Sequence, residues 1–298
     1  MKKNKPVILL LLALLVFSVT LSFLPSIKND FTNLDDGDYL VNNPLVKDLS
    51  LEGIGRIFNP LEHIYGTSFN PQLYVPMVTL SYALEYHFFN FNPQAYHSTN
   101  LILHLLNVLL VFWMIYLLCG NIYIAFITAL IFGIHPLRVE SVAWVTERKD
   151  VLYAFFYLWA VVCYLYFKRN SSIILLLGTY ILFTFSLLSK PVAVTLLFVL
   201  PLCDFYIDKK FTLRSLLNKI PIFIIAAVFA LLSQIGTRYL LLDPDFNFFD
   251  YLLIPIYSLV FYIIKIVAPL GLTCLYPYPL KSNGLFPAEF YIYRFYWL

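Results

Sequence analysis

Residues 173–189 have the sequence IILLLGTYILFTFSLLS, a predominantly apolar run without a single charged side chain. Its apolar residues are continuous and lack the alternation, about every second residue, of a membrane β-barrel strand. Inside lipid, only helices and closed barrels satisfy their own backbone hydrogen-bonding groups. This stretch therefore predicts a membrane-spanning helix, and similar stretches recur along the chain.

The composition of the whole chain indicates the same fold class. Of its 298 residues, 61% are hydrophobic and 12% are charged, whereas soluble domains are about half apolar and about a quarter charged. A single soluble core stops growing at roughly 250–300 residues, so it cannot absorb this excess. The sequence predicts an all-α integral membrane protein with several spans, organised as one transmembrane domain over residues 1–298.

Eight apolar segments are expected to be helical spans. They are residues 7–26, 97–118, 122–137, 151–167, 173–189, 192–207, 220–235 and 251–270. The first follows a basic start, reaches about 20 residues and has no clear small-residue cleavage site, which favours an uncleaved span over a signal peptide. The last contains Pro255, Lys265 and Pro269, so it either crosses the membrane or dips into it and returns.

Charged residues between the spans predict the side on which each loop lies. With a cytoplasmic N-terminus, alternation places six basic residues in the cytoplasm, as the positive-inside rule requires: Lys168, Arg169, Lys209, Lys210, Arg214 and Lys219. The loop 27–96 then lies outside, and its apolar segment 73–89, interrupted by Pro76 and Glu85, is expected to form an interfacial helix. These features fit a bacterial inner membrane, although an endoplasmic reticulum membrane would look similar.

The same topology gathers unusual charges on the outer face. LDDGDY (34–39) places Asp35 and Asp36 just after the first span, and HPLRVESVAWVTERKD (135–150) is the densest polar stretch between spans. The basic residues on this face gain nothing from the orientation rule, so they need another explanation: Arg138, Arg148, Lys149, Lys190 and Arg238. A solvated turn and weak surface salt bridges are the plainer alternative, as is snorkelling for Lys190.

These stretches resemble a known family. The matching blocks are LDDGDYLVNNPLV (34–46), YVPMVTLSYAL (74–84), NPQAYHSTNLILHLLNVLLV (92–111), IFGIHPLRVESVAWVTERKDVLYAFFYL (131–158), LLSKPVAVTLLFVLPLCD (187–204) and LYPYP (275–279). In this order they resemble the transmembrane-and-TPR protein O-mannosyltransferases and their bacterial relatives. The resemblance implies a GT-C type glycosyltransferase with interfacial helices in its first outer loop. The family continues with more spans and TPR repeats, so we expect a chain truncated before that region.

The resemblance also implies a reaction and roles for residues. A mannose-like sugar would pass from a polyprenyl-phosphate carrier to a Ser or Thr hydroxyl of a protein, a transfer that needs a base for the hydroxyl and cations for the phosphate. Adjacent acids near lipid repel one another and lose solvation, which makes one a better base. We expect Asp35 to be the base and Asp36 to orient a substrate, with Asp38 as a third candidate. The donor phosphate would be bound by Arg138, Arg148, Lys149 and Lys190.

Three further residues are expected to support this site: Glu140, which would hold Arg138 or bind a sugar hydroxyl, and the outer-face histidines His97 and His135. Polar packing between helices is the expectation for His104. No metal-like spacing is present, although a divalent metal remains open, and no nucleic-acid partner is expected. Transfer to a lipid or glycan, and an inactive membrane scaffold, are the alternatives. A transporter is disfavoured because the ionisable residues cluster at span ends.

Overall fold

The computed structural model describes residues 5–65, 73–210, 212–237 and 248–273, together with the single residues 276, 281 and 286. Within this part of the chain there are helices and no strand, which confirms the predicted fold class. Most of LYPYP (275–279), as well as Arg238, lies outside the described residues. The chain divides into two units, residues 1–238 and 239–298; the single domain 1–298 stays a prediction.

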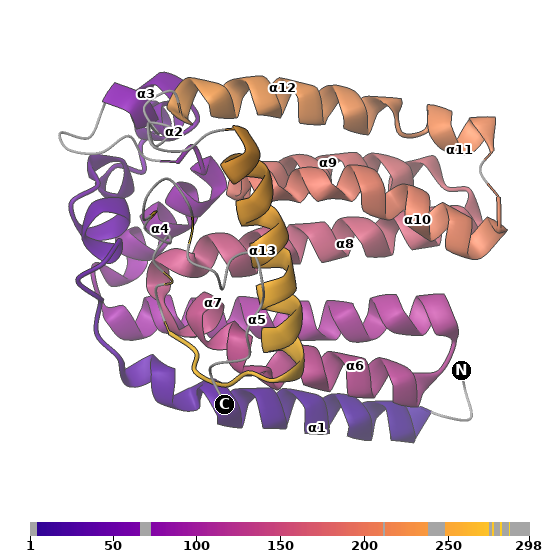
Figure 1. The fold of residues 1–298 in the computed structure, drawn as a ribbon. Coiled ribbons are helices and arrows are strands. Elements are labelled where there is room, and N and C mark those ends of the chain that lie inside the picture. Colours follow the sequence, from indigo (N-terminus) through magenta and orange to yellow (C-terminus); the bar gives the residue numbers. More distant parts are fainter. Residues whose placement is uncertain are drawn as a thin grey trace. The chain divides into compact units, whose positions relative to one another are not determined.

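Every predicted span coincides with a long helix (Figure 1). In the first unit these are α1 (Lys5–Phe23), α5 (Pro93–Cys119), α6 (Ile122–Ile134), α8 (Arg148–Asn170), α9 (Ile173–Ser189), α10 (Leu196–Asp208) and α12 (Ile220–Thr237). The second unit holds α13 (Phe248–Val267).

The other elements of the first unit lie in the connections between these helices. They are η2 (Leu24–Lys28), η3 (Gly37–Val41), η4 (Pro44–Lys47), α2 (Leu51–Ile57), α3 (Pro60–Tyr65), α4 (Pro76–Phe89), η5 (Pro136–Arg138), α7 (Val139–Ala143), η6 (Val145–Glu147), η7 (Pro191–Thr195) and α11 (Leu213–Leu217). Among them α4 is the helix expected within residues 73–89.

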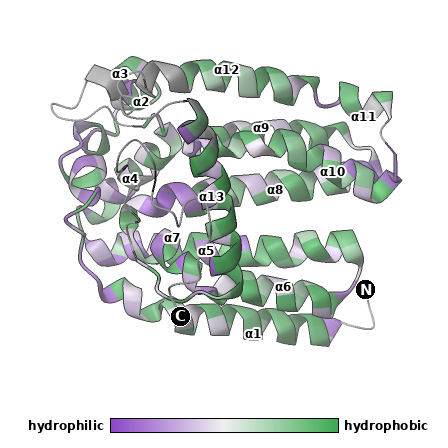
Figure 2. Cartoon of the chain, viewed as in Figure 1, coloured by the Kyte–Doolittle hydropathy of each residue, from purple (hydrophilic) through white to green (hydrophobic). Residues whose placement is uncertain are grey.

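Within the described residues, six helical segments are long and apolar enough to cross a membrane. Helix α9 is shorter at 17 residues, and α6 qualifies only together with residues 136–143, beyond a bend of 57°. Large apolar side chains point outward, as shown by Leu9 and Phe17, which are 67% and 65% exposed. Such exposure suits lipid as the surrounding solvent. Figure 2 shows hydrophobic residues along the helices and hydrophilic ones gathered towards their ends. The chain is an integral membrane protein.

Proline and asparagine set several helix boundaries differently from the prediction. The span predicted for residues 122–137 ends at Ile134, because Pro136 disfavours helical geometry in the residue before it. Helix α5 begins at Pro93, four residues before the predicted span, because the Asn92 side chain caps it by accepting from the Gln94 N–H at 3.2 Å. Helix α8 starts at Arg148, inside the expected loop.

Close packing of α1, α5 and α6 depends on a glycine. A Cβ atom at Gly133 would lie 2.6 Å from Val19 Cγ2 and 3.0 Å from Val108 Cγ2. The Gly133 carbonyl oxygen lies 2.8 Å from Nε2 of the buried His104. This contact between α5 and α6 confirms the polar packing expected for His104.

Polar contacts gather at two ends of the first unit, and Figure 1 shows α4 at one of these ends and α11 at the other. One end, with α4, holds the acid pair and the turn between α6 and α8. At the other end, near α11, the buried Asp204 accepts a hydrogen bond from Tyr164 at 2.7 Å and pairs with Lys168 and Lys219. Within the first unit, the described connections between the long helices lie at these two ends. The side of the membrane that each end faces stays a prediction.

Candidate active site

Asp36 is fixed by four hydrogen bonds. Its side chain is fully buried, and Oδ1 accepts from Trp144 Nε1 and the Thr146 N–H, both at 3.1 Å. Oδ2 accepts from the Thr32 N–H at 2.7 Å and from the Thr32 hydroxyl at 3.0 Å. An ionised carboxylate has about four acceptor sites, so this one is fully occupied. Asp36 joins the segment that follows α1 to the turn before α8.

Asp35 has the opposite environment. Its side chain is 47% exposed, and Oδ2 lies 4.0 Å from Lys149 Nζ. Its carboxylate makes no hydrogen bond and no other ion pair within the described part of the chain, while its backbone carbonyl accepts from the N–H groups of Asp38 and Tyr39. Asp38 itself lies in the first turn of η3. Of the adjacent acids, Asp35 is therefore the one whose carboxylate is free to take a proton from a substrate.

A row of alternating charges runs from Asp35 across the N-terminal end of α8. Lys149 Nζ lies 2.7 Å from Glu147 Oε1, and Glu147 Oε2 lies 4.0 Å from Lys190 Nζ. Lys190 also pairs with Asp150, whose Oδ2 accepts from the Ser141 hydroxyl at 3.1 Å. We call Asp35, Lys149, Glu147, Lys190 and Asp150 the charged row. Two of the predicted phosphate ligands thus lie together near the predicted base.

Arg148 lies elsewhere, because its guanidinium is completely buried. It forms an ion pair with Glu85 on α4. It also donates to Asn100 Oδ1 and to the Tyr96 carbonyl oxygen, both at 2.8 Å. Its carbon Cζ lies 4.8 Å from the centre of the Tyr82 ring. These contacts leave the guanidinium no open face, so Arg148 joins α4, α5 and α8 instead of reaching a ligand.

Arg138 lines a cavity of about 300 Å³ between α5, α6 and α8. Its guanidinium lies over the Phe132 ring at 4.7 Å and has no ion pair within the described residues. Asp150 lines the same cavity, so the cavity adjoins the charged row. Asn107 also lines it, and its Oδ1 is buried without a hydrogen-bond partner. The cavity therefore holds a cation and an acceptor that a bound group could satisfy.

The three expected supporting residues have different environments. Glu140 lies on α7 with much of its side chain exposed, and it makes no ion pair with Arg138. The pKa of Glu140 is raised, first by the partial burial of its carboxyl group and then by the nearby carboxylates of Glu147 and Asp150. His135 precedes η5, and its Nδ1 accepts from the Leu137 N–H at 3.2 Å. His97 is 1% exposed, and its ring nitrogens make no hydrogen bond within the described part of the chain.

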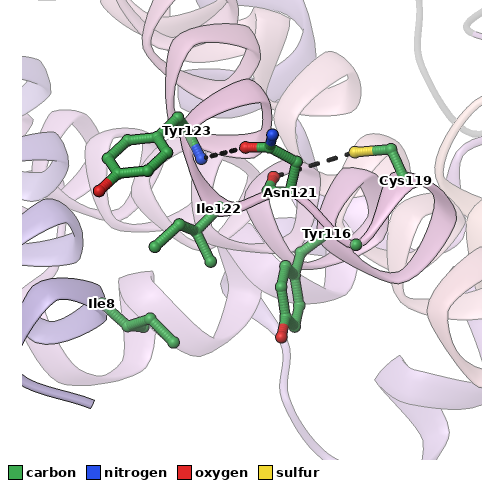
Figure 3. Close-up of a pocket in the computed structure, with 7 residues that line it drawn as sticks. Ile8, Tyr116, Cys119, Asn121, Ile122 and Tyr123 are labelled. Carbon is green, nitrogen blue, oxygen red and sulfur yellow. Dashed lines mark hydrogen bonds between the residues drawn. The ribbon is translucent and has the colours of Figure 1, made fainter. Parts of the chain in front are cut away.

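A larger cavity of about 430 Å³ lies at the turn between α5 and α6 (Figure 3). Ile8, Tyr116 and Cys119 line it, and Asn121 Oδ1 accepts from the Tyr123 N–H at 2.9 Å. It lies at the other end of α5 and α6 from the acid pair, and none of the predicted site residues line it. Among the described residues, no three His, Cys, Asp or Glu side chains form a metal-binding group.

Sequence patterns left several partners in this region unassigned. Glu147 lies within the polar stretch 135–150, and Glu85 interrupts the apolar segment 73–89, and the sequence predicts no partner for either. Glu147 pairs with Lys149, two positions further along the chain. Glu85 pairs with Arg148, which lies far from it in the sequence. The signal available was a carboxylate in an apolar segment, since such a group requires a buried partner.

No family model and no solved structure matches the chain. Curated proteins do match it. The chain is 30% identical to protein O-mannosyl-transferase TMTC2 of Mus musculus over 154 residues, which are 49% of this chain and 18% of that protein. It is 31% identical to protein O-mannosyl-transferase TMTC1 of Mus musculus over 163 residues, which are 51% of this chain and 16% of that protein. The relatives are protein O-mannosyl-transferases.

This is the family that the sequence motifs predicted. A third protein O-mannosyl-transferase, F38B6.6 of Caenorhabditis elegans, is 30% identical over 199 residues, or 62% of this chain and 28% of that protein. The chain spans less than a third of the length of each of these three protein O-mannosyl-transferases.

Proposed function

We propose that this chain forms the membrane-embedded catalytic part of a GT-C type glycosyltransferase. It transfers a mannose-like sugar from a polyprenyl-phosphate carrier to Ser or Thr hydroxyls of proteins. The observation that carries the proposal is the placement of Asp35, whose half-exposed carboxylate lies 4.0 Å from Lys149 at one end of the charged row. The names of the relatives supply the sugar and the class of acceptor.

The reaction assigns a task to each end of the row. The acceptor oxygen forms a bond to the anomeric carbon, and its proton passes to Asp35. The bond between the anomeric carbon and the phosphate oxygen breaks, and the polyprenyl phosphate leaves with the electron pair. Lys190, together with Arg138 in the adjoining cavity, stabilises the charge on the leaving phosphate. Lys149 lies beside the proposed base, with its Nζ 4.0 Å from Asp35 Oδ2.

Asp36 and Arg148 take structural tasks in this proposal. Each is fully buried and bonded on every side, so neither contacts a substrate. Asp36 instead fixes the turn that presents Asp35, and Arg148 fixes the start of α8, from which Lys149 projects. This differs from the roles expected for them from the family resemblance.

The proposed site faces the outside of a bacterial inner membrane, with the N-terminus in the cytoplasm. The support is the distribution of basic residues, because Lys168 and Lys219 lie at the end of the first unit opposite the acid pair. Labelling of single cysteines at positions 52 and 210 with an impermeant reagent tests this orientation. Labelling of intact cells at 210 but not at 52 would reverse it.

Transfer itself is tested with the full-length protein in membranes, a polyprenyl-phosphate mannose donor and a Ser/Thr-containing peptide. We expect mannosyl peptide to form and Asp35→Asn to abolish it. Mass spectrometry of the products distinguishes a peptide acceptor from a lipid or glycan acceptor. Unchanged transfer by Asp35→Asn would overturn the assignment of the base.

A further inference from the structure

We propose that Glu147 binds hydroxyl groups of the transferred sugar and thereby determines which sugar the enzyme accepts. The donor would lie along the charged row, with its phosphate at Lys190 and Arg138, its sugar beside Glu147 and its anomeric carbon open to an acceptor at Asp35. This inference rests on the proposed function and specifies its donor site.

The two oxygens of Glu147 differ in their contacts. Oε1 lies 2.7 Å from Lys149 Nζ, which holds the carboxylate in one orientation. Oε2 is 4.0 Å from Lys190 Nζ, beyond hydrogen-bond distance, and accepts no hydrogen bond from the described residues. The Glu147 side chain is 11% exposed. Glu147 is thus a largely buried carboxylate, held through one oxygen, whose other oxygen has no hydrogen bond from the described residues.

Aromatic rings lie beside the two lysines that neighbour Glu147. The Tyr39 ring centre lies 5.6 Å from Lys149 Nζ, and the Tyr153 ring centre lies 6.0 Å from Lys190 Nζ. Ligand sites commonly combine apolar and aromatic walls with a few placed polar groups. Ring faces suit the C–H faces of a sugar, and a carboxylate accepts from its hydroxyls. The charged row thus combines a carboxylate with nearby aromatic rings, the kinds of group that a sugar site uses.

The order of charges along the row also favours a sugar at Glu147. When a sugar is displaced with inversion, the base and the leaving group act on opposite faces of the ring. Asp35 neighbours Lys149, Lys149 pairs with Glu147, and Lys190 Nζ lies 4.0 Å from Glu147 Oε2. Glu147 lies between the proposed base and the proposed phosphate ligands, where the sugar ring must lie.

A plain counter-ion for the two lysines is the competing role of Glu147, and sugar selectivity separates the two. We would measure kcat/KM for polyprenyl-phosphate mannose and for donors that each lack one sugar hydroxyl. The wild-type protein is expected to lose about 10- to 100-fold with at least one deoxy donor, because a hydrogen bond to a charged group is lost. Glu147→Gln should reduce kcat/KM for the intact donor and discriminate against that deoxy donor only about twofold.

The matched control is Glu52→Gln, an equivalent change at an exposed position on α2, which should keep the wild-type discrimination. If Glu147→Gln fails to fold, Glu147→Asp replaces it in the test, because Asp retains the charge. The shorter Asp side chain moves the carboxylate oxygens away from the sugar, which should change which deoxy donor is disfavoured. Wild-type discrimination in both Glu147 variants would overturn the inference, whether or not Asp35→Asn abolishes transfer. Absence of transfer from every polyprenyl-phosphate donor by the wild-type protein would instead refute the proposed function.

Discussion

Replacement of Asp36 by Asn should destabilise the protein strongly. Asp36 accepts four hydrogen bonds, two on each oxygen. Asn has one acceptor oxygen, so its NH₂ group must face either the two Thr32 donors or the donors of Trp144 and Thr146. Two bonds to a charged group are lost at about 1.5–3 kcal/mol each. We expect the free energy of unfolding to fall by about 3–6 kcal/mol.

Replacement of the neighbouring Asp35 by Asn provides the contrast. The Asp35 side chain is 47% exposed and has one contact, at 4.0 Å from Lys149. Exposed ion pairs contribute about 0.2–1 kcal/mol, so the free energy of unfolding should change by less than about 1 kcal/mol. Loss of a general base lowers kcat by about 10²–10⁴-fold. The same chemical change at adjacent positions is thus expected to affect stability at one and transfer at the other.

Both variants would be purified in detergent and compared by denaturant unfolding and by the rate of sugar transfer at a temperature at which Asp36→Asn stays folded. Asp36→Ser serves as a second test, because a short side chain cannot span both pairs of donors. If Asp36→Asn is as stable as the wild type, the four hydrogen bonds of Asp36 do not stabilise the fold as we infer. A large loss of stability in Asp35→Asn would refute the division of roles between the two acids.

Three further substitutions test the framework around the site. Arg148→Met leaves Glu85 buried without its partner, so the free energy of unfolding should fall by about 3–5 kcal/mol; an unchanged thermal midpoint would contradict this. Asp204→Asn, at the opposite end of the first unit, removes the carboxylate that pairs with the buried Lys219, and the free energy of unfolding should fall by a similar amount. KM for the donor should stay unchanged, because Asp204 lies far from the proposed site; a large rise in KM would contradict this. Gly133→Val forces methyl groups against α1 and α5, which should cost about 1–3 kcal/mol in unfolding measurements, and a neutral effect would show that the helices can separate.

The helices were predictable because lipid imposes a simple rule on sequence. In lipid, continuous apolar runs such as 173–189 must satisfy their backbone hydrogen-bonding groups internally. The positions of these runs in the sequence therefore predict where the spans lie. The differences came from local chemistry at the ends. Asn92 and Pro93 extended α5, and Pro136 ended α6 early.

The candidate site was only partly predictable, because adjacent residues of one type received opposite environments. Asp35 and Asp36 are equivalent in sequence, yet one is half exposed and the other is enclosed by Thr32, Trp144 and Thr146. Similarly, Arg148 and Lys149 are neighbours, but a helix turns successive residues in different directions. One contacts the buried Glu85 and the other the charged row.

The sequence by itself determined that the chain is a helical membrane protein, where its spans lie and which family it resembles. These depend on local hydrophobicity and on motifs, which are properties of contiguous residues. Only the tertiary structure decided which acid is accessible, which cation is buried and that Glu147 lies between two lysines. Those properties depend on contacts between segments more than 40 positions apart, as between Glu147 and Lys190 or Asp36 and Trp144. The physical reason is that burial and pairing are set by the packing of several helices at once.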